Sequence, residues 1–457
     1  MRFFFCKNNV FFVYLHRKGE KTMRKVILFA LWALSSAYVC AQNVREELKH
    51  DLLKAGSNYY AYQGPTKALT PAPHGYKPFY ISTYARHGSR YLIKASEYDY
   101  SYNVLQKANE AGKLTDLGRR ALTQLGYLRE DAKGRYGDLT PLGAMQHQQI
   151  AQRMFDRFPE VFKGRAVIEA KSTVVIRCIL SMQNELLQLA KNNPKLIFNS
   201  DASEHDMYYM NLQDSALYKQ RYSKQTQQAY KDFCAKYEIH KPAMAKLFND
   251  TAYYNREVDA FELNKAIFKI ASSVQGTEMR DVFNLFDVYT EDELYNNWLQ
   301  ANAFWYLSFG HNPHNGGHQP FTQRNLLKRI IEDADSCIIR PNPGATLRFG
   351  HETIILPLAC LLDLNGYGRE IHDMEKLDTE GWINFEVFPM AANIQFVFYR
   401  RDKNDTDVVL KVLLNENEAR LPIPTDMAPY YHYRDFREFY VEKLQKYELE
   451  RAAQGID

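Results

Sequence analysis

The sequence has no internal repeat, no low-complexity tract and no cysteine spacing typical of a metal site. Its 457 residues include only six cysteines, and the formal net charge of +4 is small for a chain of this length. The hydrophobic and charged fractions, 46% and 25%, are ordinary. The composition therefore excludes a disordered or fibrous protein and predicts a globular chain with a large core and two domains.

Long hydrophobic runs are scarce, and the run near the N-terminus is too short to span a bilayer comfortably. It extends from Val26 to Val39, follows two basic residues after Met23, and ends in Val39, Cys40 and Ala41. This pattern predicts a secretory signal peptide that starts at Met23 and is cleaved after Ala41. A lipoprotein anchor at Cys40 is the minor alternative. We therefore expect a secreted or periplasmic protein without a stable membrane span.

The small positive charge lies in the same N-terminal segment. Residues 1–41 contain seven Lys or Arg and one Glu, so their removal lowers the formal net charge from +4 to −2. A nucleic-acid partner is therefore not expected. The four remaining cysteines are Cys178, Cys234, Cys337 and Cys360. An oxidising compartment would permit disulfides, but Cys178 and Cys360 lie in apolar runs, which favours buried thiols.

Strand and helix patterns alternate along most of the chain, which predicts an α/β fold with a mostly parallel central sheet flanked by helices. A strand is expected at Pro78–Ala85, followed by a helix that Thr140 caps, a short strand at Ala166–Ala170 and a helix that carries Arg177. Farther on, "GATLRFGHE" reads as a strand and a loop, "NIQFVFYRR" and "DVVLKVLLNENEARLPI" as two strands joined by the turn "DKNDTD", and the C-terminal tail as an amphipathic helix.

Between about Asn199 and Thr322 the sequence consists of polar and aromatic amphipathic segments with little strand signal. This segment predicts an inserted α-helical cap domain. The predicted domains are the N-terminal extension with the signal peptide at 1–41, the first part of the α/β core at 42–198, the cap at 199–322 and the second part of the core at 323–457.

Two predicted strands end in residues that suit phosphate chemistry. "TYARHGSR" places Arg86, His87 and Arg90 after one strand, and "LRFGHE" places His351 and Glu352 after another. Ligands of open α/β sheets bind beyond the carboxyl ends of the strands. Guanidinium groups can bind a tetrahedral oxyanion through two N–H donors at once. The pattern therefore predicts a phosphate pocket in which Arg86, Arg90 and His351 bind the anion and His87 attacks phosphorus.

A departing alkoxide needs a proton, and Glu352 is the predicted donor. Arg177 lies among apolar residues, where an unpaired guanidinium would be costly, so we expect it to bind the phosphate as well. Gly88 would let the backbone approach the ligand. Because arginine and histidine supply the positive charge, no metal or other cofactor is required.

Each of these residues also has an ordinary structural explanation when taken alone. Arg86, Arg90 and Arg177 could form ion pairs, His87 could be a core histidine, and His351 and Glu352 could be a helix cap and its first-turn acid. The joint occurrence of Arg-His-Gly-x-Arg and Gly-His-Glu after two strands favours a functional site. Two weaker signals have ordinary interpretations. His311, His314 and His318 are assigned to a mobile loop rather than a zinc site, and His147 is assigned to the helix surface or to a cap contact.

The sequence resembles the histidine acid phosphatases, branch 2 of the histidine phosphatase superfamily. The family motif Arg-His-Gly-x-Arg-x-Pro matches residues 86–92 except that Leu92 replaces the proline, and "LTPxGxxQ" matches residues 139–146. "STxxxRxxxS" matches Ser172, Thr173, Arg177 and Ser181. The late motif departs from both family forms, His-Asp and His-Ala-Glu, because Glu352 follows His351 directly and is followed by Thr353.

The resemblance implies an α/β core with an α-helical cap, a phosphohistidine intermediate and a small phosphorylated substrate held between core and cap. The motifs look most similar to those of the multiple inositol-polyphosphate phosphatase group, so phytate-type substrates are expected. A broad-specificity acid or sugar phosphatase is the alternative within the class. A phosphate-binding protein without turnover is the alternative of another class, although pure binding would need neither His87 nor Glu352.

Overall fold

The computed structural model describes residues 44–455. The predicted signal peptide and the alternative anchor at Cys40 lie outside the described residues. In the part of the chain that the structure describes, no helix combines the length and the apolar character that crossing a membrane would require.

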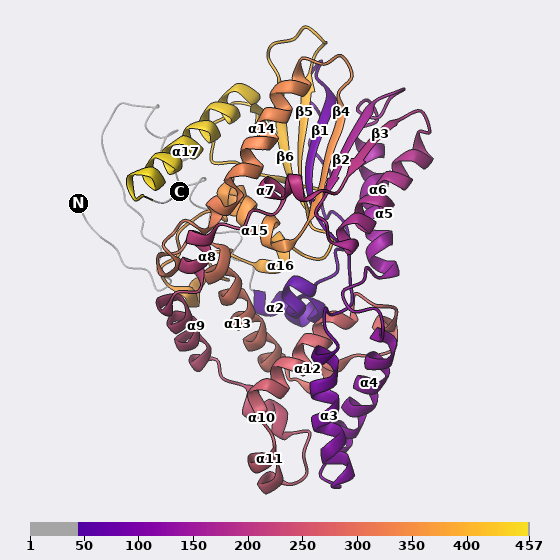
Figure 1. Cartoon of the computed structure of the whole chain (residues 1–457), viewed down its shortest axis with the longest axis vertical. Coiled ribbons are helices and arrows are strands. Elements are labelled where there is room, and N and C mark those ends of the chain that lie inside the picture. The colour runs from indigo at the N-terminus through magenta and orange to yellow at the C-terminus, as the bar shows by residue number, and fades with distance from the viewer. Residues whose placement is uncertain (1–43, 456–457) are drawn as a thin grey trace, which may run out of the picture.

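A single eight-stranded sheet forms the centre of the molecule, as Figure 1 shows. The strand order is β3-β2-β4-β1-β5-β6-β7, and β8 pairs with β6. The strands are β1 (Lys77–Arg86), β2 (Val167–Ser172), β3 (Ile197–Asp201), β4 (Gly344–Gly350), β5 (Asn393–Arg400), β6 (Val409–Leu414), β7 (Asn417–Ala419) and β8 (Tyr431–His432).

The sheet is mixed. β3, β2, β4 and β1 pair in parallel, whereas β5, β6, β7 and β8 add antiparallel pairings. The predicted α/β class is confirmed. Each predicted strand is present, but the last is shorter than expected, because the predicted segment 407–423 divides into β6 and β7 at a two-residue turn. The parallel half matters most for function, because the carboxyl ends of its strands lie at one edge of the sheet.

Helices cover both faces of the sheet, and the alternation of side chains along β1 explains why (Figure 1). Tyr80 and Tyr84 point to the face covered by α14 (Arg324–Ile338), α15 (Glu352–Leu361) and α17 (Tyr433–Ala453). Ile81 and Ala85 point to the opposite face, where α5 (Pro141–Arg157) and α6 (Ile176–Asn192) pack. As predicted, Thr140 caps α5, with its hydroxyl accepting the Gly143 N–H.

The other end of the molecule is helical. It contains α9 (Lys224–Lys236), α10 (His240–Ala245), α11 (Thr251–Glu257), α12 (Ala260–Val274) and α13 (Glu291–Phe309), all within the predicted cap. Two helices from residues assigned to the core, α3 (Ser96–Glu110) and α4 (Asp116–Ala132), lie beside them, and α3 packs on α12 (Figure 1). The limits of the cap domain stay a prediction.

The shorter helices connect these parts. They are α2 (Val44–His50), α7 (Met207–Met210), α8 (Ser215–Arg221) and α16 (Asn384–Val387). Among the described residues the four cysteines are free thiols, and Cys178 and Cys360 are buried, as their apolar surroundings in the sequence predict.

Candidate active site

The two predicted phosphate-binding loops follow neighbouring parallel strands. β1 ends at Arg86 and β4 ends at Gly350, and these two residues are partners in the parallel register. The loop residues that follow them, His87 on one side and His351 with Glu352 on the other, therefore emerge side by side. β2, on the other side of β4, leads through Thr173 into α6, which carries Arg177.

The His87 imidazole is buried, with 1% of its surface exposed. Its Nδ1 lies 2.8 Å from the carbonyl oxygen of Gly88, which can only accept, so Nδ1 carries the hydrogen. Nε2 is then the unprotonated nitrogen, and it makes no hydrogen bond to any described residue. Burial and the positive charges of Arg86, Arg90 and Arg177 lower the pKa of His87 well below its usual value. The ring is therefore a neutral base with an available lone pair at neutral pH.

Glu352 lies opposite this lone pair. Its Oε2 is 3.9 Å from His87 Nε2 and 3.1 Å from Arg86 Nε. Burial acts to raise the pKa of the Glu352 carboxyl, but the charges of Arg86 and Arg90 outweigh it and lower this pKa to about 2. The carboxyl is thus ionised in the protein alone, and a bound anion beside the same arginines would shift its pKa upward.

Three guanidinium groups surround this pair, and each keeps nitrogen donors free. Arg86 donates through Nη1 to the Phe388 carbonyl, 2.8 Å away, but its Nε and Nη2 make no aligned hydrogen bond. Nε of Arg90 and Nε of Arg177 also lack partners among the described residues. Burial and the repulsion of Arg90 lower the pKa of Arg177. Three like charges beside one carboxylate, with buried nitrogen atoms that lack hydrogen-bond acceptors, are costly, which indicates that the arrangement is built to bind an anion.

His351 precedes α15, and its Nε2 lies 3.3 Å from the hydroxyl of Thr173. Burial lowers the pKa of His351 to about 4, with Arg177 and Arg86 adding to the effect and Glu352 opposing it. The ring is therefore neutral at neutral pH. It can approach a phosphate as a hydrogen-bond donor, whereas the sequence analysis expected a positive contact.

Ligand atoms of His87, His351 and Glu352 lie within 4.8 Å of one another, a spacing at which a metal ion could bind. However, the guanidinium group of Arg86 lies 3.1 Å from Glu352 Oε2, and the charge of Arg90 also acts on this carboxyl. Positive charge at this density favours an anion over a cation.

The motif that begins α5, residues 139–146, holds the backbone of the loop after β1. The Ser89 N–H donates to the side-chain oxygen of Gln146 at 2.9 Å, and the Ser89 carbonyl accepts from the Thr140 N–H at 2.9 Å. A Cβ on Gly88 would lie 2.3 Å from the Gly143 carbonyl oxygen. The glycine is thus explained by the close approach of these two backbones, a reason that differs from the expected approach to a ligand.

The remaining backbone groups of the loop are held from three other directions. The His87 N–H donates to the Gly350 carbonyl at 2.9 Å, and the Gly88 N–H donates to the Ser181 hydroxyl at 3.1 Å. The Ala391 N–H donates to the His87 carbonyl at 3.0 Å from a left-handed conformation with φ of 62°. Such strain in a non-glycine residue is typical of functional sites.

The interpretation of His147 as a surface residue is wrong. This side chain is buried, and it contacts Glu185 of α6 and the Arg86 carbonyl. Helical spacing could have indicated this, because His147 shares one face of α5 with Gly143, Ile150 and Met154, all of them buried. No comparable signal in the sequence marks Ala391.

Comparisons with known proteins agree with this geometry. The family model described as "Histidine phosphatase superfamily (branch 2)" matches residues 82–415. No curated protein sequence matches the chain significantly.

Two solved structures have a similar fold. A multiple inositol polyphosphate phosphatase from Bifidobacterium longum, in complex with inositol hexasulfate, is 17% identical over 83% of this chain and 96% of its own, with a TM-score of 0.69. The phytase from D. castellii is 13% identical over 86% of this chain and 84% of its own, with a TM-score of 0.61.

The fold and the paired strand-end loops define a phosphatase of the α/β class. Because the family match covers most of the sequence, the chain belongs to branch 2 of the histidine phosphatase superfamily. The predicted family and the predicted enzyme class are confirmed. At these identities the structural neighbours establish the fold, and they leave the substrate open.

Proposed function

We propose that the protein is a secreted, metal-independent phosphomonoesterase that acts through a phosphohistidine intermediate, with inositol polyphosphates such as phytate as substrates. The observation that carries the proposal is the unprotonated, unpartnered Nε2 of buried His87, which faces Glu352 at 3.9 Å among guanidinium groups with free donors. Arg86, Arg90, Arg177 and His351 bind the phosphoryl oxygens in this scheme.

In the first half-reaction the lone pair on His87 Nε2 attacks phosphorus, and the bond from phosphorus to the ester oxygen breaks. Glu352 gives its proton to the leaving alkoxide. The carboxyl can hold this proton because the bound phosphate neutralises the arginines that otherwise keep its pKa at about 2. Arg86, Arg90 and Arg177 stabilise the charge on the equatorial oxygens.

In the second half-reaction water attacks the phosphohistidine, and the bond between phosphorus and Nε2 breaks. The Glu352 carboxylate takes one proton from that water, and inorganic phosphate leaves. His87 returns to its neutral form, and its Nδ1–H stays bonded to the Gly88 carbonyl throughout. This hydrogen bond stabilises the tautomer that both steps require.

The substrate class is proposed from the motif resemblance, and two fold neighbours are an inositol polyphosphate phosphatase and a phytase. Secretion is proposed from the pattern of residues 23–41. Metal independence is proposed from the charge of the site, where three guanidinium groups take the role that Mg²⁺ has in other phosphoryl-transfer enzymes.

The test is release of inorganic phosphate from a chromogenic monoester and from a panel with phytate, glucose phosphates and other sugar phosphates, with and without chelator. The proposal predicts turnover that chelator leaves unchanged and a preference for phytate in kcat/KM. Loss of activity with chelator would contradict the metal-free scheme. Phosphate binding without turnover would favour a binding protein, and equal rates across the panel would favour a broad acid phosphatase.

A further inference from the structure

A second buried histidine lies behind the candidate active site. His147 of α5 and Glu185 of α6 are both buried, and their Nδ1 and Oε2 atoms are 3.0 Å apart. The other ring nitrogen of His147, Nε2, lies 3.1 Å from the carbonyl oxygen of Arg86. The pair takes no part in the reaction scheme above, yet it contacts the residue that precedes the proposed nucleophile.

The hydrogen positions in this pair follow from its partners. A carbonyl oxygen only accepts, so His147 Nε2 must carry a hydrogen. Nδ1 then either donates to an ionised Glu185 or accepts from a protonated one. Burial raises the pKa of Glu185, and His147 opposes that shift. In both arrangements the pair is neutral overall, so it can stay buried, and Nε2 remains a donor to Arg86.

The Arg86 carbonyl and the His87 N–H belong to the same peptide group. The carbonyl accepts from His147 on α5, and the N–H donates to Gly350 at the end of β4, 2.9 Å away. The plane of this peptide is therefore fixed from two sides. Because the peptide sets where the Cα–Cβ bond of His87 points, it also sets the direction of the imidazole.

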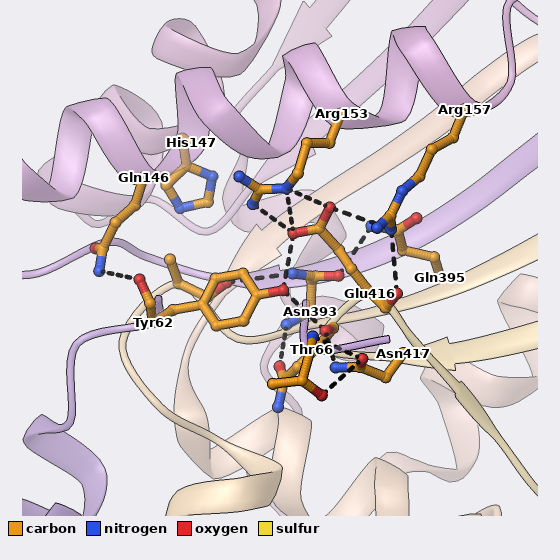
Figure 2. Close-up of polar contacts among 12 residues, drawn as sticks. Tyr62, Thr66, Gln146, His147, Arg153, Arg157, Asn393, Gln395, Glu416 and Asn417 are labelled. Atoms are coloured by element: carbon orange, nitrogen blue, oxygen red, sulfur yellow. Dashed lines mark hydrogen bonds and ion pairs between the residues drawn. The ribbon is translucent and has the colours of Figure 1, made fainter. Parts of the chain in front are cut away.

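The helix that carries His147, α5, is also held near its C-terminal end. Arg153 donates to Glu416 in the turn between β6 and β7 through Nε at 2.9 Å and through Nη2 at 2.5 Å. Arg157 donates to the Glu416 carbonyl at 3.1 Å. Figure 2 shows His147 on the same helix as these two arginines, with Gln146 reaching the carbonyl of Tyr62. A side chain on such a fixed helix can position a loop precisely.

We propose that the His147–Glu185 pair positions the active-site loop by fixing the peptide between Arg86 and His87, so that Nε2 of His87 points at the phosphorus atom. The inference rests on the proposed function. His147 touches neither substrate nor reacting atoms in this account, so it is a positioning residue, and Glu185 acts through it.

The test compares His147→Leu, which removes the donor, with His147→Gln, whose amide nitrogen stands at the same number of bonds from Cα as Nε2. Gln148→Leu is the matched control, because Gln148 also bonds α5 to α6, through Asn184, but does so at the surface and away from Arg86. Activity is measured on a chromogenic monoester well below the melting temperature of each variant.

We expect kcat of His147→Leu to fall roughly 10- to 100-fold with little change in KM, because a misdirected nucleophile slows chemistry more than binding. His147→Gln should recover most of kcat, and Gln148→Leu should keep all of it. A purely structural role would lower the melting temperature of His147→Leu and leave kcat per folded molecule unchanged. That result would overturn the inference.

The wild-type protein supplies a second measurement, which covers the case in which His147→Leu fails to fold. In protein labelled with ¹⁵N-histidine, nuclear magnetic resonance at neutral pH should show a slowly exchanging hydrogen on Nε2 of His147. An unprotonated Nε2 would overturn the inference. This readout does not depend on turnover. A wild-type chain without phosphatase activity would contradict the proposed function, and the nuclear magnetic resonance result would still show whether His147 donates to the Arg86 carbonyl.

Discussion

The molecule contains two buried charge clusters that differ in how their charges are paired. The Glu416 cluster, formed by Tyr62, Arg153, Arg157 and Glu416, is saturated: the carboxylate accepts from Arg153 and from the Tyr62 hydroxyl at 2.8 Å (Figure 2). At the candidate active site, nitrogen atoms of four residues have no hydrogen-bond partner within residues 44–455, namely Arg86, His87, Arg90 and Arg177. The surplus of positive charge is larger in the second cluster, where three arginines face one carboxylate, than in the first, where two do.

The difference separates a structural role from a functional one. Buried charges that serve stability are normally fully paired, since an unpaired one costs several kcal/mol. Glu416 and Asn415 both have positive φ, 59° and 50°, because they form the two-residue hairpin turn between β6 and β7. At the candidate site the donors without partners lie near one carboxylate and one imidazole. The free-energy cost of leaving them unpaired is tolerated there because an anion can bind.

The largest expected effect concerns the nucleophile. His87→Ala should lower kcat by at least roughly 10³-fold and leave the protein folded, because no other described group replaces Nε2 beside Glu352. Phosphate release and circular dichroism check the two parts. Activity near the wild-type level in a folded variant would exclude His87 as the nucleophile.

Glu352→Gln should separate esters by their leaving groups. Hydrolysis of an alkyl phosphate should slow by roughly 10²- to 10⁴-fold, because the alkoxide needs a proton, whereas formation of the phosphoenzyme from a nitrophenyl phosphate should be far less affected. Burst kinetics on both esters measure this. Equal losses for both would count against Glu352 as the acid.

Glu416→Gln should do the opposite of the active-site variants. It leaves Arg153 and Arg157 without a buried anion, so the free energy of unfolding should fall by roughly 3–5 kcal/mol, whereas kcat of the folded enzyme should fall far less than in the active-site variants. Urea denaturation measures the loss. Glu257→Gln, which breaks the exposed pair with Lys107, is the control and should cost under about 1 kcal/mol. Similar losses of unfolding free energy in Glu416→Gln and Glu257→Gln would contradict the structural role of the Glu416 cluster.

The low pKa of Glu352 makes its contribution to stability depend on pH. The carboxyl has a pKa of about 2 in the folded protein against an ordinary value of 4.5, so it stabilises the fold above pH 4.5 and loses that effect as pH falls toward 2. The gap in unfolding free energy between wild type and Glu352→Gln should be on the order of 3 kcal/mol at neutral pH and shrink in acid. A difference in unfolding free energy between wild type and Glu352→Gln that does not change with pH would contradict the ion pair between Arg86 and Glu352.

The smallest expected effect is a gain. Arg177→Met removes a guanidinium that Arg90 repels, so the free energy of unfolding should rise by about 1 kcal/mol while KM for phosphate esters increases. Thermal unfolding and steady-state kinetics measure the two changes. A loss of stability would show that Arg177 has a structural partner.

The sequence predicted β1, β2, β4, β5 and the start of β6, because apolar β-branched runs are local signals, and it marked the Arg, His and Glu that follow two of these strands. The adjacency of β1 and β4 follows from pairing between residues some 260 positions apart, as in Tyr80 with Gly344, and no local signal in the sequence predicts which strands pair. The residues that hold the backbone around His87 were harder to predict from the sequence. His147 had a helical-spacing signal that was missed, whereas Ala391 acts through its backbone N–H and conformation, which its side chain does not reveal.

The central claim is that His87 Nε2 forms a bond to phosphorus. The direct measurement is to quench Glu352→Gln during turnover of a nitrophenyl phosphate, digest it and locate the phosphoryl group by mass spectrometry, since loss of the base should slow hydrolysis of the intermediate. The account predicts an acid-labile phosphoryl group on the peptide that contains His87. Turnover with no phosphorylated peptide, or with the group on another residue, would contradict it.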